Sequence, residues 1–364
     1  MLPVLFQVVI PAGLGLPLAI GLEVLIVALR AWGALRRARQ EGEPGTLGGA
    51  LRDDGWVIGA LTAAVILLWR ADLLGGDIRV PLHTYGLLIA SAFLVGIWLA
   101  QREGRRRGQD PERIADLSFW ILVAALVGSR VYFILVNWGD YFGDRALVAT
   151  PFGRIPRILA VWEGGLVFYG GFIGAALTAL WYLRRHRMAF LPYADTLIPS
   201  VAFGHFLGRL GCFAAGCCWG EVVHGHLPWA ARFPPASLAY QSFASRPRPE
   251  AFLAPDRLAT LPLHPVQLYE AFGELAIFLV LVLVVRPRKR FHGQVLATWL
   301  LAYAVLRTVV ELFRGDVERG VVAGLGVGQW TSLAILAAGA AVWARASRRP
   351  AGAPAQGSRS AGAR

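Results

Sequence analysis

Long apolar segments constrain the fold of this chain more than any other feature. A helix needs about 20 apolar residues to cross the hydrocarbon core of a bilayer. By this criterion the sequence predicts about nine membrane-spanning helices, near residues 4–29, 55–71, 84–101, 115–136, 164–183, 193–211, 268–285, 293–312 and 325–344. The predicted fold class is therefore an all-α polytopic membrane protein.

Arginine-rich loops between these segments predict the orientation. Short loops with an excess of Lys and Arg stay on the cytoplasmic side of a membrane. Such loops follow the first, third, fifth and seventh segments, at residues 30–39, 102–107, 184–187 and 286–290. This alternation predicts an extracytoplasmic N-terminus and a cytoplasmic C-terminus.

The net charge of +13 does not indicate nucleic-acid binding. A nucleic-acid-binding surface needs a solvated domain to carry it, whereas these basic residues fall in short runs between apolar segments. Only 16% of the residues are charged and 56% are hydrophobic, which is typical of a chain that faces lipid.

Ionisable side chains inside the predicted helices point to a functional site. A charged residue there costs about 2.5–3.5 kcal/mol on insertion scales, so it usually faces a cavity or a partner. These residues are Arg130, Arg209, Arg307, Glu311 and Arg314. The last three are spaced i, i+4 and i+7, which places them on one helix face, with Tyr303 one turn earlier.

One Glu cannot neutralise four Arg, so the sequence leaves an excess of positive charge. Guanidinium groups bind phosphate through paired hydrogen bonds, and a phosphate at membrane depth is most simply a phospholipid headgroup. The alternative is that Arg307 and Glu311 form a structural pair while the other arginines extend to the membrane interface.

Glycine pairs flank an aromatic strip at the start of the fifth segment, at residues 164–165 and 170–171. Glycine permits close backbone approach, and irregular backbone at membrane depth is tolerated where it lines an enclosed cavity. Ordinary helix packing through small residues is the alternative for Gly171.

Eight short motifs, in order from about residue 80 to 344, resemble those of the bacterial prolipoprotein diacylglyceryl transferase family. They lie at residues 83–86, 128–130, 162–171, 208–211, 219–220, 264–270, 303–314 and 328–329. The resemblance implies a seven-span enzyme of the bacterial inner membrane, without a cofactor. It implies transfer of the diacylglyceryl group of phosphatidylglycerol to the lipobox Cys thiol of a prolipoprotein, with release of glycerol phosphate. A related transferase with another acceptor, or an anion or lipid transporter, are the alternatives.

The resemblance also suggests a domain organisation. Residues 1–75 form an N-terminal extension with two putative spans, and residues 76–345 form the transferase membrane core. Within the core, residues 212–267 are rich in Pro and aromatic residues and are predicted to form an extracytoplasmic cap. The basic tail, residues 346–364, is predicted to be disordered and cytoplasmic.

By the same resemblance Arg209 and Arg307 are catalytic, because positive charge stabilises the charge that develops on a departing phosphate oxygen. The expected substrate-binding residues are Tyr85, Arg130, Gly170, Gly171, His264, Gln267, Tyr303, Glu311 and Arg314. A structural role at a helix entrance is the alternative for His264, since Pro265 suits the first turn of a helix.

Three positions depart from the family: Tyr169 replaces a His, Cys212 an Asn and Cys217 a Glu. Tyr, with an ordinary pKa of about 10, is a poor base near neutrality unless nearby arginines lower that pKa. Tyr169 is therefore a catalytic candidate if nearby arginines lower its pKa. Otherwise Arg209 and Arg307 carry more of the activation of the incoming thiol.

Cys212, Cys217 and Cys218 lie at the predicted extracytoplasmic end of the sixth segment. A disulfide between Cys212 and one of the other two is plausible on that oxidising side. Buried free thiols are one alternative and a metal site with a histidine is another, although the paired CxxC spacing of zinc sites is missing and no metal is predicted. The histidines considered are His205, His224 and His226.

Overall fold

The computed structural model describes residues 4–10, 78–142, 147–150, 153–159, 165, 167–315, 321–322 and 325–348, with single residues at 20, 24 and 63. The chain divides into two compact units. The larger holds Met1–Pro3, His83–Gly143 and Val161–Arg364, and the smaller holds Val4–Leu82 and Asp144–Ala160.

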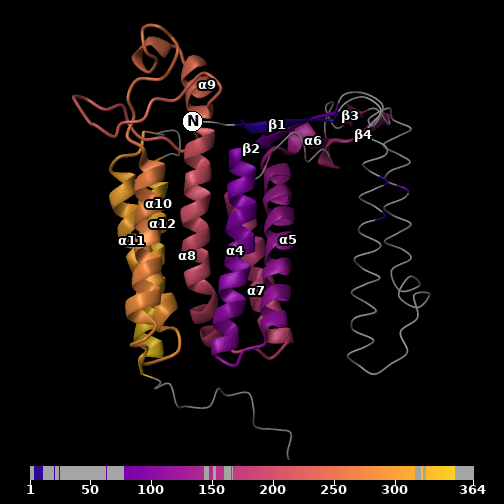
Figure 1. Ribbon diagram of the computed structural model, residues 1–364, viewed down its shortest axis with the longest axis vertical. Coiled ribbons are helices and arrows are strands. Elements are labelled where there is room, and N and C mark those ends of the chain that lie inside the picture. The colour runs from indigo at the N-terminus through magenta and orange to yellow at the C-terminus, as the bar shows by residue number, and fades with distance from the viewer. Residues whose placement is uncertain are drawn as a thin grey trace, which may run out of the picture. The chain divides into compact units, whose positions relative to one another are not determined.

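Long helices make up the larger unit and run side by side (Figure 1). They are α4 (Thr84–Arg106), α5 (Pro111–Val136), α7 (Phe168–Arg185), α8 (Phe190–Ala215), α10 (Val266–Val280) with its π-helical continuation η4 (Leu281–Val285), α11 (Gln294–Glu311) and α12 (Val327–Ala346). They coincide with the predicted segments from residue 84 onwards. Five of them, α4, α5, α8, α10 with η4, and α11, are long and apolar enough to cross a membrane. The chain is a mainly helical, multi-pass membrane protein.

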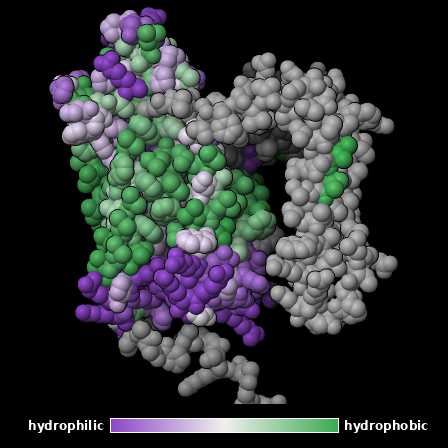
Figure 2. Space-filling model, in the orientation of Figure 1, coloured by the Kyte–Doolittle hydropathy of each residue, from purple (hydrophilic) through white to green (hydrophobic). Residues whose placement is uncertain are grey.

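The helix surfaces are suited to lipid. Large apolar side chains point outward along the helices, including Leu94, Phe172, Leu177 and Leu283. Figure 2 shows a hydrophobic belt around the helices above a hydrophilic band. The last turn of α4 carries Arg105 and Arg106, and the last turn of α7 carries Arg184 and Arg185. These helix ends lead into two of the arginine-rich loops noted in the sequence.

The helices pack in pairs, α5 with α7, α4 with α8, α8 with α10, and α11 with α12. The α5–α7 pair is very close because glycines face each other. A Cβ atom on Gly128 or on Gly170 would collide with the other residue's carbonyl, so no larger residue fits at either position. This glycine contact serves ordinary helix packing, the alternative considered for the glycine pairs.

The segment between α8 and α10 folds around an apolar core of its own. It contains α9 (Leu238–Ala244) and η3 (Pro249–Ala251), and lies at one end of the helices (Figure 1). Its buried core residues are Phe233, Ala239, Phe243, Leu253 and Leu263. The ends of the predicted 212–267 region belong to the helices instead, since α8 continues to Ala215 and α10 begins at Val266.

Short elements complete the structure. In the smaller unit β1 (Val4–Ile10) pairs with β2 (Ile78–His83), and β3 (Leu147–Thr150) pairs antiparallel with β4 (Gly153–Pro156), which η1 (Arg157–Leu159) follows. The larger unit also contains α6 (Trp138–Phe142) and the antiparallel pair of β5 (Val321–Val322) and β6 (Leu325–Gly326).

The prediction of a helix starting at residue 4 is wrong for Val4–Ile10, which is a strand. This run is rich in β-branched and aromatic residues, and periodicity cannot distinguish strand from helix in so short an apolar segment. Most of the predicted 4–29 span, the 55–71 span and the tail beyond residue 348 lie outside the described residues.

Candidate active site

Glu270 on α10 brings together two arginines from different helices. Its carboxylate is almost completely buried. Arg209 on α8 donates from Nη2 to Glu270 Oε1 at 2.8 Å, and Arg307 Nη1 on α11 lies 3.9 Å from Glu270 Oε2. The structure therefore joins the two arginines predicted to be catalytic, through a carboxylate that was not among the predicted site residues.

Glu311 holds Arg307 from the other side. Its Oε2 lies 2.6 Å from Arg307 Nη2, which confirms the i, i+4 pairing expected from the sequence. Gly328, at the start of α12, makes room for this carboxylate, because a Cβ atom there would lie 2.6 Å from Glu311 Oε2 and closer still to Oε1. The Gly328–Gln329 motif thus contributes space for Glu311.

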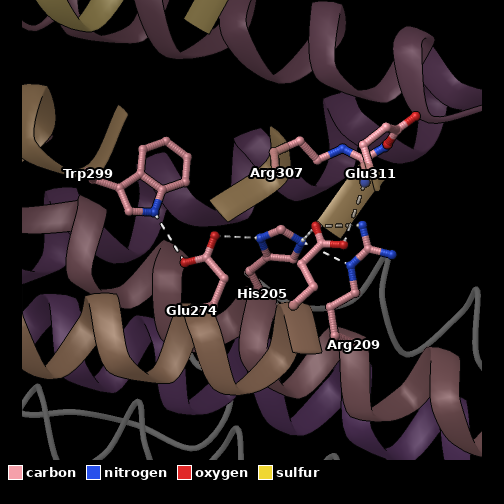
Figure 3. Close-up of polar contacts among 7 residues, drawn as sticks. His205, Arg209, Glu274, Trp299, Arg307 and Glu311 are labelled. Atoms are coloured by element: carbon pink, nitrogen blue, oxygen red, sulfur yellow. Dashed lines mark hydrogen bonds and ion pairs between the residues drawn. The ribbon is translucent and has the colours of Figure 1, made fainter. Parts of the chain in front are cut away.

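A second buried carboxylate lies one turn further along α10. Glu274 Oε1 is 2.9 Å from His205 Nδ1, and Trp299 Nε1 donates to Glu274 Oε2 at 3.3 Å (Figure 3). Arg209 Nε donates to His205 Nε2 at 3.3 Å, while the other ring nitrogen, Nδ1, faces Glu274. The Glu274–His205 pair therefore orients Arg209.

These contacts correct the charge balance inferred from the sequence. Glu270 and Glu274, spaced i, i+4 on α10, add two buried carboxylates to Glu311, so the excess of positive charge is smaller than predicted. Two Glu residues inside one apolar segment were the sequence signal that could have revealed them. Even so, Arg307 Nη1 is buried and has no hydrogen-bond partner among the described residues. That donor is available to an anion.

Aromatic rings border the cluster. Tyr303 stacks on Trp299 with ring centroids 5.5 Å apart, and its edge contact with His205 is also 5.5 Å. Tyr85 on α4 lies against Gly211, where an added Cβ would be 3.0 Å from the tyrosine Cδ2. Of these two predicted binding residues, Tyr303 contacts the cluster, whereas Tyr85 contacts α8 at Gly211, two residues after Arg209.

The folded segment between α8 and α10 is tied to the end of α11. Gly220 pairs with Arg314 in an isolated antiparallel bridge, and its N–H donates to the His264 carbonyl at 3.1 Å. Arg314 is buried. His264 Nδ1 lies 3.2 Å from Tyr269 Oη. These contacts favour the structural interpretation of His264 at the entrance to α10.

Arg130 belongs to the α5–α7 pair. It is buried, donates from Nη1 to the Gly165 carbonyl at 3.4 Å, and lies over the ring of Tyr141 at 5.3 Å. Gly170 and Gly171 are buried against α5; a Cβ on Gly171 would lie 2.5 Å from Ser129 Oγ.

Tyr169, the third predicted catalytic residue, lies on the first turn of α7. Its side chain is 49% exposed and its ring contacts Phe168 on the same helix. Within the described part of the chain it makes no hydrogen bond or ion pair with the Arg209–Glu270–Arg307 cluster. The structure therefore gives no contact through which those arginines would act on its hydroxyl.

Cys212, Cys217 and Cys218 are close together but free. Their Sγ atoms all lie within 4.8 Å of one another, and none is in a disulfide. The disulfide suggested by the sequence is therefore not formed in this structure. Gln267 Nε2 donates to the Cys217 carbonyl at 2.7 Å, which fixes the thiol-bearing turn to α10.

Comparison with known proteins identifies the family of this chain. The family model described as prolipoprotein diacylglyceryl transferase matches residues 76–345. The chain is 34% identical over 286 residues to the phosphatidylglycerol–prolipoprotein diacylglyceryl transferase of Yersinia enterocolitica, covering 75% of this chain and 92% of that protein. It is 34% identical over 276 residues to the enzyme so named from Sodalis glossinidius, covering 74% and 91%. For that of Thermosynechococcus vestitus the identity is 33% over 238 residues, covering 65% and 79%.

Proposed function

Because this chain belongs to the prolipoprotein diacylglyceryl transferase family, we propose that its Arg209–Glu270–Arg307 cluster performs the family's reaction. The chain is a membrane transferase that moves the diacylglyceryl group of phosphatidylglycerol to a prolipoprotein. The acceptor atom is the lipobox cysteine sulfur. A bond forms between this sulfur and a glyceryl carbon, the bond from that carbon to the phosphate oxygen breaks, and glycerol phosphate leaves.

The observation that carries the assignment is Arg307 Nη1, which is buried near Glu270, the carboxylate that also binds Arg209, and has no hydrogen-bond partner among the described residues. A phosphodiester headgroup offers acceptor oxygens to such donors. In the transition state negative charge grows on the departing oxygen, so fixed donors in a poorly hydrated site stabilise it more than they stabilise the substrate. Glu270, Glu311 and His205 keep the two guanidinium groups in position while donors remain for the lipid.

The same positive charge favours the nucleophile. A thiolate attacks, not a thiol, and a nearby cation lowers the pKa of a thiol. Arg209 and Arg307 thus raise the thiolate fraction of the incoming cysteine, and its proton passes to a base. This role matters more here because Tyr169 replaces the family's His.

The remaining predicted residues support the substrates from around the cluster. Tyr85 and Tyr303 line the lipid site, while Arg130 and Arg314 add positive charge to it. Gly170 and Gly171 keep α7 close to α5, and His264 and Gln267 hold the entrance of α10. The buried and interhelical contacts of the glycines, His264 and Gln267 support these roles.

We further propose the arrangement in the membrane. Nine spans, including two in the extension of residues 1–75, lie in the bacterial inner membrane with the N-terminus outside. The arginine-rich ends of α4 and α7 support a cytoplasmic location for that end of the helices. The folded segment within residues 212–267 is then an extracytoplasmic cap on the side where prolipoproteins present the lipobox.

The test uses the purified chain in phosphatidylglycerol vesicles with a lipobox peptide. Release of glycerol phosphate and formation of the lipidated peptide are measured for the wild type and for Arg307→Lys, which keeps the charge but loses the planar fork. We expect a loss of about 100-fold or more, as for removal of one transition-state donor. Arg288→Ala is the control, since Arg288 is exposed in the turn after η4 and its Nη1 donates to the nearby Val284 carbonyl at 3.4 Å. Full activity of Arg307→Lys would refute the assigned role.

A cellular test complements this assay. The chain is expressed in a strain depleted of its own transferase, with Arg209→Ala as the inactive variant. Growth restored by the wild type and not by Arg209→Ala is expected. If a well-expressed wild-type chain fails to restore growth, a prolipoprotein is not its acceptor.

A further inference from the structure

Three thiols converge where α8 ends. Cys212 lies on the last turn of α8, and Cys217 and Cys218 follow the turn that terminates it. Their sulfur atoms lie within 4.8 Å of one another. Two sulfurs bound at about 2.3 Å to one tetrahedral zinc ion lie about 3.8 Å apart, so the three thiols need to approach by only about 1 Å. The thiols are therefore already nearly close enough to share one ion.

The backbone holds this arrangement in place. The Cys217 N–H donates to the Cys212 carbonyl at 3.1 Å, and Gly216 takes a positive φ of 68° at the end of α8. Gln267 Nε2 fixes the Cys217 carbonyl at 2.7 Å. Cys218 has a φ of 57°, in the left-handed region that is unfavourable for a non-glycine residue. The turn maintains this conformation, so the thiols are organised before any ligand arrives.

We propose that Cys212, Cys217 and Cys218 form a three-thiolate binding site for a soft or borderline metal ion, Zn²⁺ or Cu⁺. Thiolate ligands select these ions over the hard cations Mg²⁺ and Ca²⁺. The site is independent of the transferase activity proposed above, because it uses none of the side chains of the arginine–glutamate cluster as ligands.

The surrounding charge favours such a site. Three thiolates carry three negative charges, so a complex with Zn²⁺ or Cu⁺ remains anionic and needs positive charge nearby. Arg209 and Arg314 supply positive charge near these sulfurs, so the two guanidinium groups favour the anionic, metal-loaded site.

The histidines considered from the sequence are not needed as ligands. His205 already contacts Glu274 through Nδ1 and Arg209 through Nε2. His224 and His226 are exposed, and the metal-ligand group found among the described residues consists of the three thiols. Because Zn²⁺ is usually four-coordinate, three protein thiolates leave one position for a water molecule or another small ligand.

The experiment measures metal content and spectra on the full-length chain in detergent. The protein is purified under reductant, stripped with a chelator, and titrated with Zn²⁺ and with Cu⁺, and Co²⁺ serves as a spectroscopic probe because its thiolate complexes have a charge-transfer band. We expect about one ion per chain, loss of thiol reactivity on binding, and affinity lowered about tenfold or more in Cys212→Ser, Cys217→Ser and Cys218→Ser. His224→Ala and His226→Ala are the controls and should bind normally.

If a serine variant fails to fold, metal binding by the stripped wild-type protein still tests the proposal. A stripped wild-type chain that binds neither ion while its three thiols react freely would overturn the proposal. So would a disulfide that consumes two of the thiols in the purified protein, or loss of binding in either histidine control.

Discussion

A buried carboxylate lies near each end of the helical unit and links α8 to α10, to α11 or to the turn between them. The two carboxylates differ in their hydrogen-bond and ion-pair partners. At one end Asp195 of α8 accepts hydrogen bonds from the backbone N–H groups of Gly293 and Leu296, at 2.7 and 3.0 Å, and its Oδ2 lies 2.7 Å from Lys289 Nζ. At the other end Glu270 of α10 binds Arg209 and lies near Arg307.

The difference lies in which groups remain unsatisfied. Both oxygens of Asp195 are engaged by the first turn of α11 and by a cation, an arrangement that caps a helix. At Glu270 the guanidinium groups offer more donors than the carboxylates accept, and Arg307 Nη1 has no hydrogen-bond partner among the described residues. The carboxylate of Asp195 thus has its contacts completed within the fold and stabilises it, whereas beside Glu270 a buried guanidinium donor remains for a ligand.

The largest effect is expected for Glu270→Gln. The amide keeps the shape but removes the charge that positions Arg209 and Arg307, and breaking a buried ion pair costs about 3–5 kcal/mol. We expect transfer to fall about 100-fold or more, measured as glycerol phosphate released per folded molecule.

Glu103→Gln is the matched control for this change. Glu103 is also a buried glutamate, but it pairs with Arg286 and Arg107 at the arginine-rich end, at 3.1 and 2.7 Å. Activity per folded molecule should stay within about threefold of the wild type. Equal losses in the two variants would show that the ends do not differ in function.

Asp195→Asn is expected to affect stability instead. The amide cannot accept two backbone hydrogen bonds and pair with Lys289 as the carboxylate does, and hydrogen bonds to charged groups contribute about 1.5–3 kcal/mol each. Thermal unfolding in detergent should begin at a lower temperature, while activity per folded molecule at low temperature is retained.

Asp110→Asn provides the comparison for that measurement. Asp110 caps α5 by accepting from the Glu112 N–H at 2.9 Å, and Asn is an equally good capping residue at such an exposed position. Its unfolding temperature should change little. If Asp195→Asn lowered transfer activity at temperatures where the protein is still folded, the Asp195 end would influence the Glu270 cluster more strongly than their contacts indicate.

Sequence reasoning predicted the helices of the larger unit well, because each is a long apolar run bounded by charge. It also paired Arg307 with Glu311, since an i, i+4 relation depends only on helix geometry. It did not predict that Glu270 links Arg209 to Arg307, because that contact joins residues on three different helices and depends on how those helices pack. It assigned a helix to Val4–Ile10, where an apolar run of seven residues carries no decisive periodicity.

Gly328→Ala should reduce transfer activity less than Glu270→Gln does. It tests whether the position of Glu311 within the cluster matters for activity. The new methyl would displace the Glu311 carboxylate, which holds Arg307 at 2.6 Å. We expect a loss of about tenfold in transfer, equivalent to about 1.4 kcal/mol.

The neighbouring Gly326→Ala is the control for this substitution. A Cβ atom at Gly326 would lie 4.0 Å from Glu311 Oε1, an ordinary contact, so activity should remain within about twofold. Equal losses in the two variants would indicate a general disturbance at the start of α12, and not the displacement of Glu311.

The smallest effect is expected for Tyr169→Phe. This substitution tests whether a residue outside the Arg209–Glu270–Arg307 cluster takes part in the reaction. Tyr169 is half exposed on α7, and its ring contacts Phe168 and not the arginines. Removing only the hydroxyl should leave the kcat of transfer within about twofold, because a tyrosine with an ordinary pKa of about 10 is a poor base near neutrality. A loss of tenfold or more, with a changed dependence of kcat on pH, would assign the acid–base step to α7. In that case the guanidinium groups of Arg209 and Arg307 would bind the lipid phosphate but would not suffice to activate the thiol.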